Sequence, residues 1–456
     1  MKDQTLSLSN RISLAWLAVL LAALFVNGQT KGIEQRLENV AGLIRDNRIE
    51  EAEQQLKGIL KTSPNDASAL NLMGTIRAQQ GKLDEAEVLL THAAKNDPTF
   101  VPVHMNLALL YLLRNAPEKT ISELKEVVRL EPNNLEANYK LARLLLSRGQ
   151  TNEAIVVIEK VDSKSPAFVT LLGDAYLKKG DISKAEGNYL QALAAQKDNA
   201  DAALGLARVS QSRGDLKTAQ AYFSRARAQA GNSPDLLYKV GVTALGLRDF
   251  DEAQAALEQA VKLKPGEASY LTALGATWLK KADLFTAEQI FRRAIELQPD
   301  NAQTQLYLGY VLYKQKKFNE AKGYLEKSIK ADALVSEPFY YLGLIAQEAN
   351  EDEQAVTLLE KAIQAAPSFA NAHVALGASY LKLKDYPHAQ KELELGVSLN
   401  PDDSKAHYQL AVLYARLKDP KRAQAEMQIV ERLKSVEQSE KKEGDTFVIS
   451  PVPNLP

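Results

Sequence analysis

The sequence has 456 residues, with 56 lysines and arginines against 57 aspartates and glutamates, and a net charge of −1. This near neutrality argues against a strongly basic nucleic-acid binder. The absence of cysteine excludes disulfides, thiolate metal sites and a cysteine nucleophile. The chain is too long for one ordinary hydrophobic core, whereas an array in which each repeat contacts only its neighbours has no such limit.

The first 28 residues have the pattern of a targeting segment. Lys2 and Arg11 give the segment a weakly positive start, and an apolar run follows from Leu14 to Val26. This run is shorter than the roughly 20 residues that a membrane span needs. We predict that residues 1–28 are a signal peptide cleaved near Gln29, which makes the mature protein periplasmic or secreted and leaves it without a membrane span. The alternative is that the segment 12–26 stays uncleaved and anchors the protein in the inner membrane.

From Ile33 to Lys434 the sequence repeats with a period of 34 residues, apart from one shorter interval. An alanine, replaced once by threonine, marks the period at Ala52, Ala86, Thr120, Ala154, Ala185, Ala219, Ala253, Ala287, Ala321, Ala355, Ala389 and Ala423. The units begin near Ile33, Ala67, Val101, Leu135, Pro166, Ala200, Pro234, Ala268, Ala302, Ser336, Ala370 and Ser404. Each holds two apolar runs at helical spacing, which predicts about twelve stacked helix–turn–helix units.

The unit from Ala268 to Asn301 explains why the helices of a pair approach closely. Gly275 lies in the middle of its first helix, where glycine costs about 1 kcal/mol against alanine. A small residue recurs at this position in all units but the first, which has Val40. Ala287 and Ala294 lie seven residues apart on one stripe of the second helix, and we expect the glycine to face this stripe and so to let the two helices approach closely.

Acidic residues recur just before the second helix, and we interpret them as helix N-caps rather than as catalytic or metal-binding carboxylates. They are Asp181, Asp215, Asp249, Asp283, Asp385 and Asp419.

The short interval lies between Val161 and Phe168, and we expect altered stacking there. We therefore predict one segment of units from 33 to 165 and a second from 166 to 435. Residues 436–456 hold three prolines and are predicted to form a polar, disordered tail.

This skeleton resembles the tetratricopeptide repeat family, in which Leu-Gly, an aromatic residue, an alanine and a final proline recur. Among the matching residues are Gly275, Trp278, Ala287, Phe291 and Pro299. The resemblance implies an all-α, right-handed α-solenoid whose first helices line a concave groove. It also implies a non-enzymatic scaffold that binds a segment of a partner protein, with a role in cell-envelope assembly or export. The alternatives are a regulatory or adaptor subunit of an envelope enzyme complex whose catalytic part is another chain, and a spacer whose groove binds nothing.

No motif in the sequence predicts catalysis, a cofactor or a metal site. His104, His373 and His407 share one repeat position, and His373 and His407 fall on adjacent first helices. No third ligand accompanies this adjacent pair, so we interpret the histidines as packing residues.

In the family, certain first-helix positions face the groove, and in this chain they carry tyrosines and cations. The predicted protein-binding residues are Tyr307, Tyr310, Tyr313, Lys314, Tyr340, Tyr341, Lys382, Tyr408 and Arg416, with Lys280 one repeat earlier. Aromatic rings beside cations suit protein recognition. We predict that Tyr310, Tyr313 and Tyr340 carry the binding. Of the family's carboxylate clamp the sequence holds only fragments, such as Asn106 and Lys140, and so a chaperone-tail adaptor is not indicated.

Overall fold

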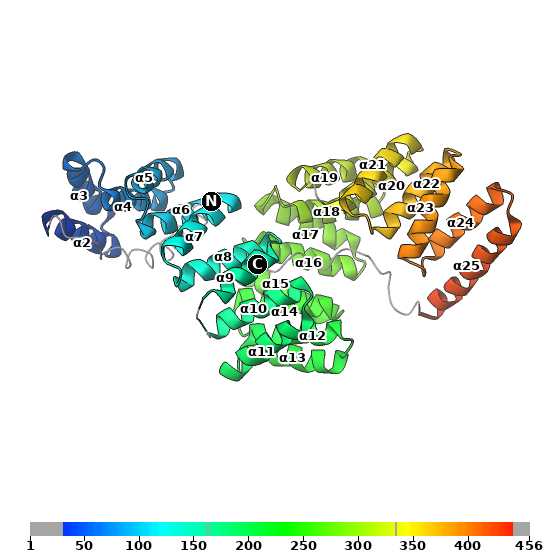
Figure 1. Cartoon of the computed structure of the whole chain (residues 1–456), viewed down its shortest axis with the longest axis horizontal. Helices are drawn as coiled ribbons and strands as arrows, with labels where there is room; N and C mark the ends of the chain where they lie inside the picture. The colour runs from blue at the N-terminus through cyan, green and yellow to red at the C-terminus, as the bar shows by residue number, and fades with distance from the viewer. Residues whose placement is uncertain (1–30, 162, 164, 333–334, 441–456) are drawn as a thin grey trace. The chain divides into compact units, whose positions relative to one another are not determined.

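The computed structural model describes residues 31–161, 163, 165–332 and 335–440, and the regular structure of that part is entirely α-helical (Figure 1). The predicted signal peptide, the alternative anchor segment and residues 441–456 lie outside the described residues. None of the helices in the described ranges is both long and apolar enough to cross a membrane. The prediction of an all-α fold is therefore confirmed for the part of the chain that the structure describes.

The helices alternate between the first and the second helix of each unit. The first helices are α2 (Lys31–Arg45), α4 (Ala67–Gln79), α6 (Val101–Leu113), α8 (Leu135–Ser147), α10 (Pro166–Lys179), α12 (Ala200–Ser212), α14 (Pro234–Gly246), α16 (Ala268–Lys280), α18 (Ala302–Lys314), α20 (Ser336–Glu348), α22 (Ala370–Lys382) and α24 (Ser404–Arg416). The second helices are α3 (Ile49–Thr62), α5 (Leu83–Asn96), α7 (Pro117–Leu130), α9 (Thr151–Glu159), α11 (Ile182–Ala195), α13 (Leu216–Gln229), α15 (Phe250–Leu263), α17 (Leu284–Leu297), α19 (Phe318–Ala331), α21 (Asp352–Ala365), α23 (Tyr386–Leu399) and α25 (Pro420–Glu440). Apart from α2, every first helix begins at the residue predicted for its unit.

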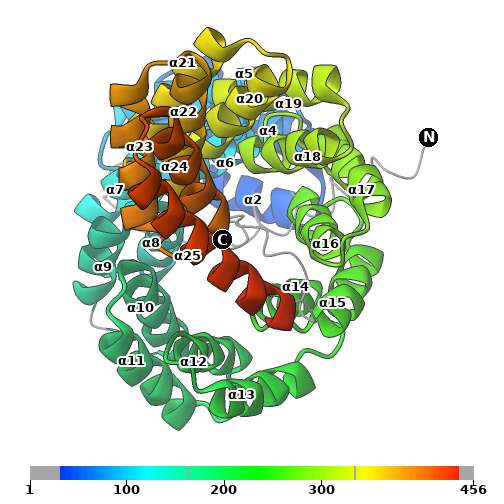
Figure 2. The ribbon, with the colours of Figure 1, turned by 90° about the vertical axis from the view of Figure 1, so that its right-hand side faces the viewer.

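The fold is an α-solenoid, organised as two compact units that divide between Val209 and Ser210, inside α12. In the second unit each first helix packs against its own second helix and also against the first helix of the next pair, from α14 to α24 (Figure 2). This arrangement sets one face of the first helices side by side along that unit.

The division does not fall near residue 165, where we expected it. The shorter repeat interval is accommodated by a shorter second helix, because α9 has 9 residues where α11 has 14. The stacking continues across the shorter turn: Tyr176 Oη donates to Glu159 Oε1 at 2.5 Å, and the rings of Tyr139 and Phe168 meet edge to face at 5.6 Å. A second boundary also moves, since α25 continues to Glu440 and residues 436–440, predicted as tail, are helical.

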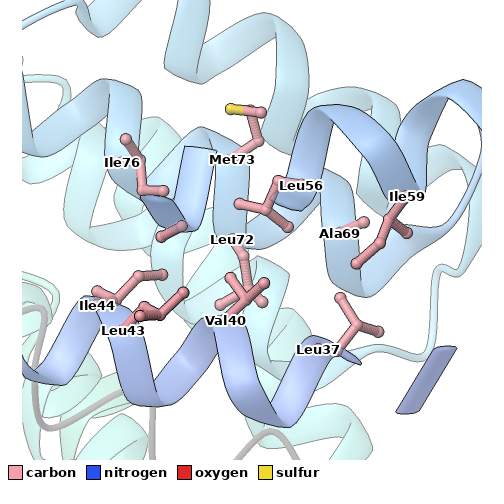
Figure 3. Packing of buried hydrophobic residues seen from close by; sticks show 11 residues of the cluster. Leu37, Val40, Leu43, Ile44, Leu56, Ile59, Ala69, Leu72, Met73 and Ile76 are labelled. Carbon is pink, nitrogen blue, oxygen red and sulfur yellow. The ribbon is translucent and has the colours of Figure 1, made fainter. Parts of the chain in front are cut away.

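A continuous apolar core runs through neighbouring pairs. At the start of the first unit Val40, Leu56, Ile59 and Ile76 from α2, α3 and α4 are fully buried against one another (Figure 3). Val40 takes the place that a small residue holds in the later helix pairs. The outer side of α2 is polar, as the end of a repeat array requires.

The mid-helix glycines let the two helices of a pair approach closely, as predicted, but they face large side chains of the second helix and not the expected stripe of alanines. A β-carbon at Gly275 would lie 2.6 Å from the ring of Phe291, and one at Gly309 would lie 2.8 Å from Leu325. The first unit has the same contact, with Gly173 against Tyr189. Because real β-carbons do not approach other atoms so closely, glycine sets the distance between the helices of a pair.

The aspartates before the second helices are N-caps, as predicted. Asp283 Oδ1 accepts a hydrogen bond from the Thr286 backbone N–H at 2.9 Å, and Asp181 Oδ1 accepts one from Lys184 at 3.1 Å. The same bond is made by Asp215, Asp249, Asp385 and Asp419.

Candidate protein-binding site

Four of the predicted tyrosines form one cluster on α18 and α20. The ring of Tyr341 lies at its centre, with centroids 5.1 Å from Tyr310, 5.7 Å from Tyr313 and 5.1 Å from Tyr340. The ring of Tyr340 also lies 5.0 Å from Phe369, which precedes α22. Aromatic pairs at such distances add about 0.5–1.5 kcal/mol beyond the area that they bury. We call Tyr310, Tyr313, Tyr340 and Tyr341 the tyrosine cluster.

The cluster has an inner and an outer pair. Tyr310 and Tyr341 are only 7% and 9% exposed, whereas Tyr313 and Tyr340 are half-buried. Tyr310 was predicted to carry binding, but its burial leaves little of its ring for a partner to contact, and with Tyr341 it supports the two outer rings. Burial raises the pKa of Tyr313, Tyr340 and Tyr341 above the ordinary value for tyrosine. Like any tyrosine hydroxyl at neutral pH, these groups are protonated and can donate hydrogen bonds.

Two other predicted tyrosines lie apart from the cluster. Tyr307 is almost completely buried, and its ring packs 5.5 Å from that of Phe291 in the core. A partner cannot reach such a ring, and we leave Tyr307 out of the proposed binding surface. Tyr408 on α24 is 47% exposed, which makes it the most accessible of the predicted tyrosines.

The predicted cations lie at the carboxyl ends of the first helices. Lys314 and Arg416 are exposed and make no ion pair or hydrogen bond within the described residues. Lys382 Nζ lies 3.4 Å from Asp352 Oδ1 and 3.4 Å from the Gln347 carbonyl oxygen. Lys280 is half-buried, and burial together with the charge of Arg248 lowers its pKa.

The sequence interpretation omitted apolar residues on the same face. Leu344, Leu381 and Val412 are half-buried at the repeat positions that were used to select the tyrosines and cations. Repeat position alone would have identified them, but only aromatic and charged residues were considered. They add apolar surface between the tyrosine cluster and Tyr408.

The three histidines at one repeat position are packing residues, as predicted. His104 Nδ1 lies 2.7 Å from Glu123 Oε2, and its Nε2 lies 3.1 Å from the Pro98 carbonyl oxygen. The other two repeat this geometry: His373 with Glu392 and Pro367, and His407 with Glu426 and Pro401. Each ring thus ties its first helix to its own second helix and to the preceding turn. The described residues hold no group of three or more side chains arranged to bind a metal.

The clamp fragments in the first unit are engaged with neighbouring side chains. Asn106 Nδ2 donates to Asn71 Oδ1 at 2.8 Å and to Thr75 Oγ1 at 3.2 Å. Lys140 Nζ forms an ion pair with Glu136 at 2.6 Å. The Asn106 contacts join α6 to α4, whereas the Lys140 pair lies within α8, and neither assembles a set of cations around a carboxylate.

Comparisons with known families identify the repeats. Residues 42–99 and 306–370 match one tetratricopeptide repeat model, and residues 344–404 match a second. Residues 132–337 match the model described as the C-terminal domain of cilia and flagella-associated protein 70. The chain is a tetratricopeptide repeat protein. Its repeats support a protein-interaction scaffold, and scaffolds of this family are generally non-catalytic.

Solved structures similar to this tetratricopeptide repeat protein have low sequence identity to it. PilF of Pseudomonas aeruginosa is 21% identical, with a TM-score of 0.41, over 46% of this chain and 96% of that one. MamA is 22% identical, with a TM-score of 0.33, over 36% and 97%. A chain of the APC/C hetero-tetramer Cut9–Hcn1 is 13% identical, with a TM-score of 0.48, over 91% and 97%. A comparison with curated proteins gives no match.

Proposed function

We propose that this protein is a non-enzymatic scaffold of the cell envelope that holds a segment of a partner protein on the face of α18 to α24. The observation that carries the proposal is the tyrosine cluster with its buried inner pair and half-buried outer pair. Tyrosine gives a large contact area and a polar tip at little conformational cost, and it is enriched among the residues that dominate binding energy. Tyr313, Tyr340 and Tyr408 are the proposed anchors.

The rings of the tyrosine cluster pack against one another in the absence of a partner. Tyr341 already contacts three rings, and its helix packs against α18 and α22. A preorganised surface loses less side-chain entropy on association, so more of the contact energy appears as affinity. Lys314, Lys382 and Arg416 lie at the rim, where charges chiefly affect the association rate and its dependence on salt.

Photo-cross-linking in the producing cell tests the binding face. A photoreactive phenylalanine analogue at Tyr408 or Tyr313 should form an adduct with one partner, identified by mass spectrometry. Phe285 is the matched control, because it is an aromatic residue of the same unit, 69% exposed, on the second helix α17. Adducts from Phe285 but not from Tyr408 or Tyr313 would place the binding surface on the second helices instead.

The envelope role rests on the apolar run from Leu14 to Val26, which lies outside the described residues. Cell fractionation and sequencing of the mature amino terminus test it. We expect protein in the periplasm or the medium that begins near Gln29. Membrane-bound protein that retains Met1 would replace the signal peptide by an anchor.

A further inference from the structure

The turn after each first helix contains a residue in the left-handed region, and its identity differs between the two units. In the first unit these residues are Asn47, Gly81, Asn115, Gly149 and Gly180. Glycine and asparagine adopt this conformation readily, whereas other side chains are strained in it. In the second unit four such turns carry a cation, at Arg248, Lys316, Lys384 and Lys418, with φ between 59° and 64°. The second unit thus places charge where the backbone disfavours it.

Three of these cations have no partner among the described residues that would account for them. Lys316, Lys384 and Lys418 are exposed and make no ion pair or hydrogen bond within the described residues. Neighbouring turn positions behave differently. Lys281 Nζ lies 2.7 Å from Asp251, and Lys317 Nζ lies 2.9 Å from Glu288, so both reach back to the preceding helix pair.

Each of the three turns carries a second cation two residues earlier, at the end of the helix. The pairs, which we call the cationic edge, are Lys314 with Lys316, Lys382 with Lys384, and Arg416 with Lys418. The turn after α20 interrupts the edge with Glu348 and Asn350.

Carboxylates adjoin the edge but are engaged. Asp385 caps α23 and contacts His388 Nδ1 at 2.7 Å, while Asp419 accepts a hydrogen bond from Arg422 Nε at 2.6 Å. Within the edge itself, Lys382 is paired with Asp352 at 3.4 Å. The other five cations keep their positive charge available to a partner.

We infer that the cationic edge binds an acidic stretch of the partner segment that lies on the tyrosine cluster. This inference rests on the proposed function, because Lys314 directly follows Tyr313 and the edge borders the same helices. First helices that pack together lie about 8–10 Å apart. An extended chain advances about 3.3 Å per residue, so acidic residues spaced by three would reach successive turns. The interruption after α20 predicts a spacing of six, and then of three, along the partner.

A labelled synthetic peptide of repeated Asp-Pro-Ala triplets is the probe. Proline favours an extended helix with about three residues per turn, which sets the aspartates on one side at about 9 Å intervals. Fluorescence anisotropy with the full-length protein should show salt-sensitive binding. The triple variant Lys316→Gly, Lys384→Gly, Lys418→Gly should bind about tenfold more weakly. Its thermal midpoint should stay level or rise, because glycine relaxes the left-handed backbone.

Two matched variants separate charge from backbone strain. Ala282 holds the same left-handed position without a charge, with φ of 62°. Ala282→Gly should raise the thermal midpoint and leave peptide binding unchanged. Asn350→Lys fills the gap in the edge and should tighten peptide binding severalfold.

Three outcomes would overturn the inference. The first is peptide binding that the triple variant leaves unchanged. The second is equal affinity for a peptide with the same aspartates placed consecutively. The third is a wild-type protein that binds phosphatidylserine vesicles but not the peptide, together with a triple variant that no longer binds the vesicles. This result would assign the edge to a membrane. The partner captured at Tyr408 separates the two proposals. If the double variant Tyr313→Ala, Tyr340→Ala weakens its binding and the triple variant does not, the proposed function stands and the acidic contact does not.

Discussion

The two units share a skeleton and differ in what they build on it. Both close their helix pairs with a glycine against a large ring, Gly173 with Tyr189 in the first and Gly275 with Phe291 in the second. Both cap their second helices with aspartate. Features that occur in both units are explained by folding alone, because any helix pair of this kind needs them. Features confined to one unit are therefore the better candidates for function.

The first-helix faces differ at equivalent positions. Leu112 and Tyr139 in the first unit stand where Tyr313 and Tyr340 stand in the second. Leu112 is 55% exposed, and among the described residues the ring of Tyr139 contacts one other aromatic ring, that of Phe168, so these residues form no cluster there. In the second unit, cations at left-handed positions cost about 1–2 kcal/mol each. The second unit thus gives up stability for surface properties that the first unit lacks.

The largest expected effect comes from the centre of the tyrosine cluster. Tyr341→Ala removes the ring that three others contact and should lower the free energy of unfolding of the second unit by about 3–5 kcal/mol. Hydrogen exchange should show the loss in α18 to α22 and leave α4 to α7 protected. Tyr341→Phe keeps the ring and should cost much less. Equal loss of protection in both units would show that they do not fold independently.

Overpacking one of the glycine contacts that both units share should lower the free energy of unfolding by less than Tyr341→Ala does. Gly309→Leu overpacks the contact with Leu325 and should cost about 1–3 kcal/mol, as should Gly275→Leu. Gly323 on α19 is the control, since a β-carbon there would meet nothing within 4 Å. Gly323→Leu should leave stability level or raise it. A uniform loss of hydrogen-exchange protection across all helix pairs after Gly309→Leu would contradict coupling between nearest neighbours.

Exchanging the turn residues between units should shift stability in opposite directions. Lys384→Gly should raise the free energy of unfolding by about 1 kcal/mol, and Gly149→Lys should lower it by a similar amount. Urea denaturation of each variant measures both. Destabilisation by Lys384→Gly would mean that the lysine makes a stabilising contact in solution.

The smallest effect concerns a feature found in both units, the histidine tied to a carboxylate and a carbonyl. Burial alone would lower the pKa of His104, but its contacts with Glu123 and the Pro98 carbonyl outweigh burial and raise it. The resulting stabilisation is fully present below about pH 6.5 and is lost as the pH rises through the raised pKa of His104. Urea denaturation at several pH values should show this loss in the wild type.

His104→Asn should flatten that pH dependence while keeping the contact with the carbonyl. Asn138 shows that asparagine can do so, because its Nδ2 donates to the Pro132 carbonyl at 2.9 Å. An unchanged pH profile in His104→Asn would assign the dependence to other groups. Since the geometry recurs in both units, partner binding should not change.

The sequence predicted the helices closely because their causes are local and repeated. Period, mid-helix glycine and capping aspartate each recur at one repeat position, and so Pro234 and Ala268 could be named as helix starts. The boundary between units was wrong because the shorter interval only truncates α9, and the stacking across it survives. Repeat position also could not separate the buried Tyr307 and Tyr310 from the half-buried Tyr313, since burial depends on the rings of neighbouring helices. The left-handed turns were missed because Lys316 or Lys384 alone gives no signal of a positive φ.

The most direct test compares the equivalent faces of the two units against the partner captured at Tyr408. Isothermal titration would measure its affinity for Tyr313→Ala, Tyr340→Ala in the second unit and for Leu112→Ala, Tyr139→Ala in the first, with circular dichroism confirming each fold. We predict at least about tenfold weaker binding for the second-unit variant, which is about 1.4 kcal/mol, and no change for the first-unit variant. Unchanged affinity in the second-unit variant, or a loss confined to the first-unit variant, would contradict the assignment of binding to the second unit.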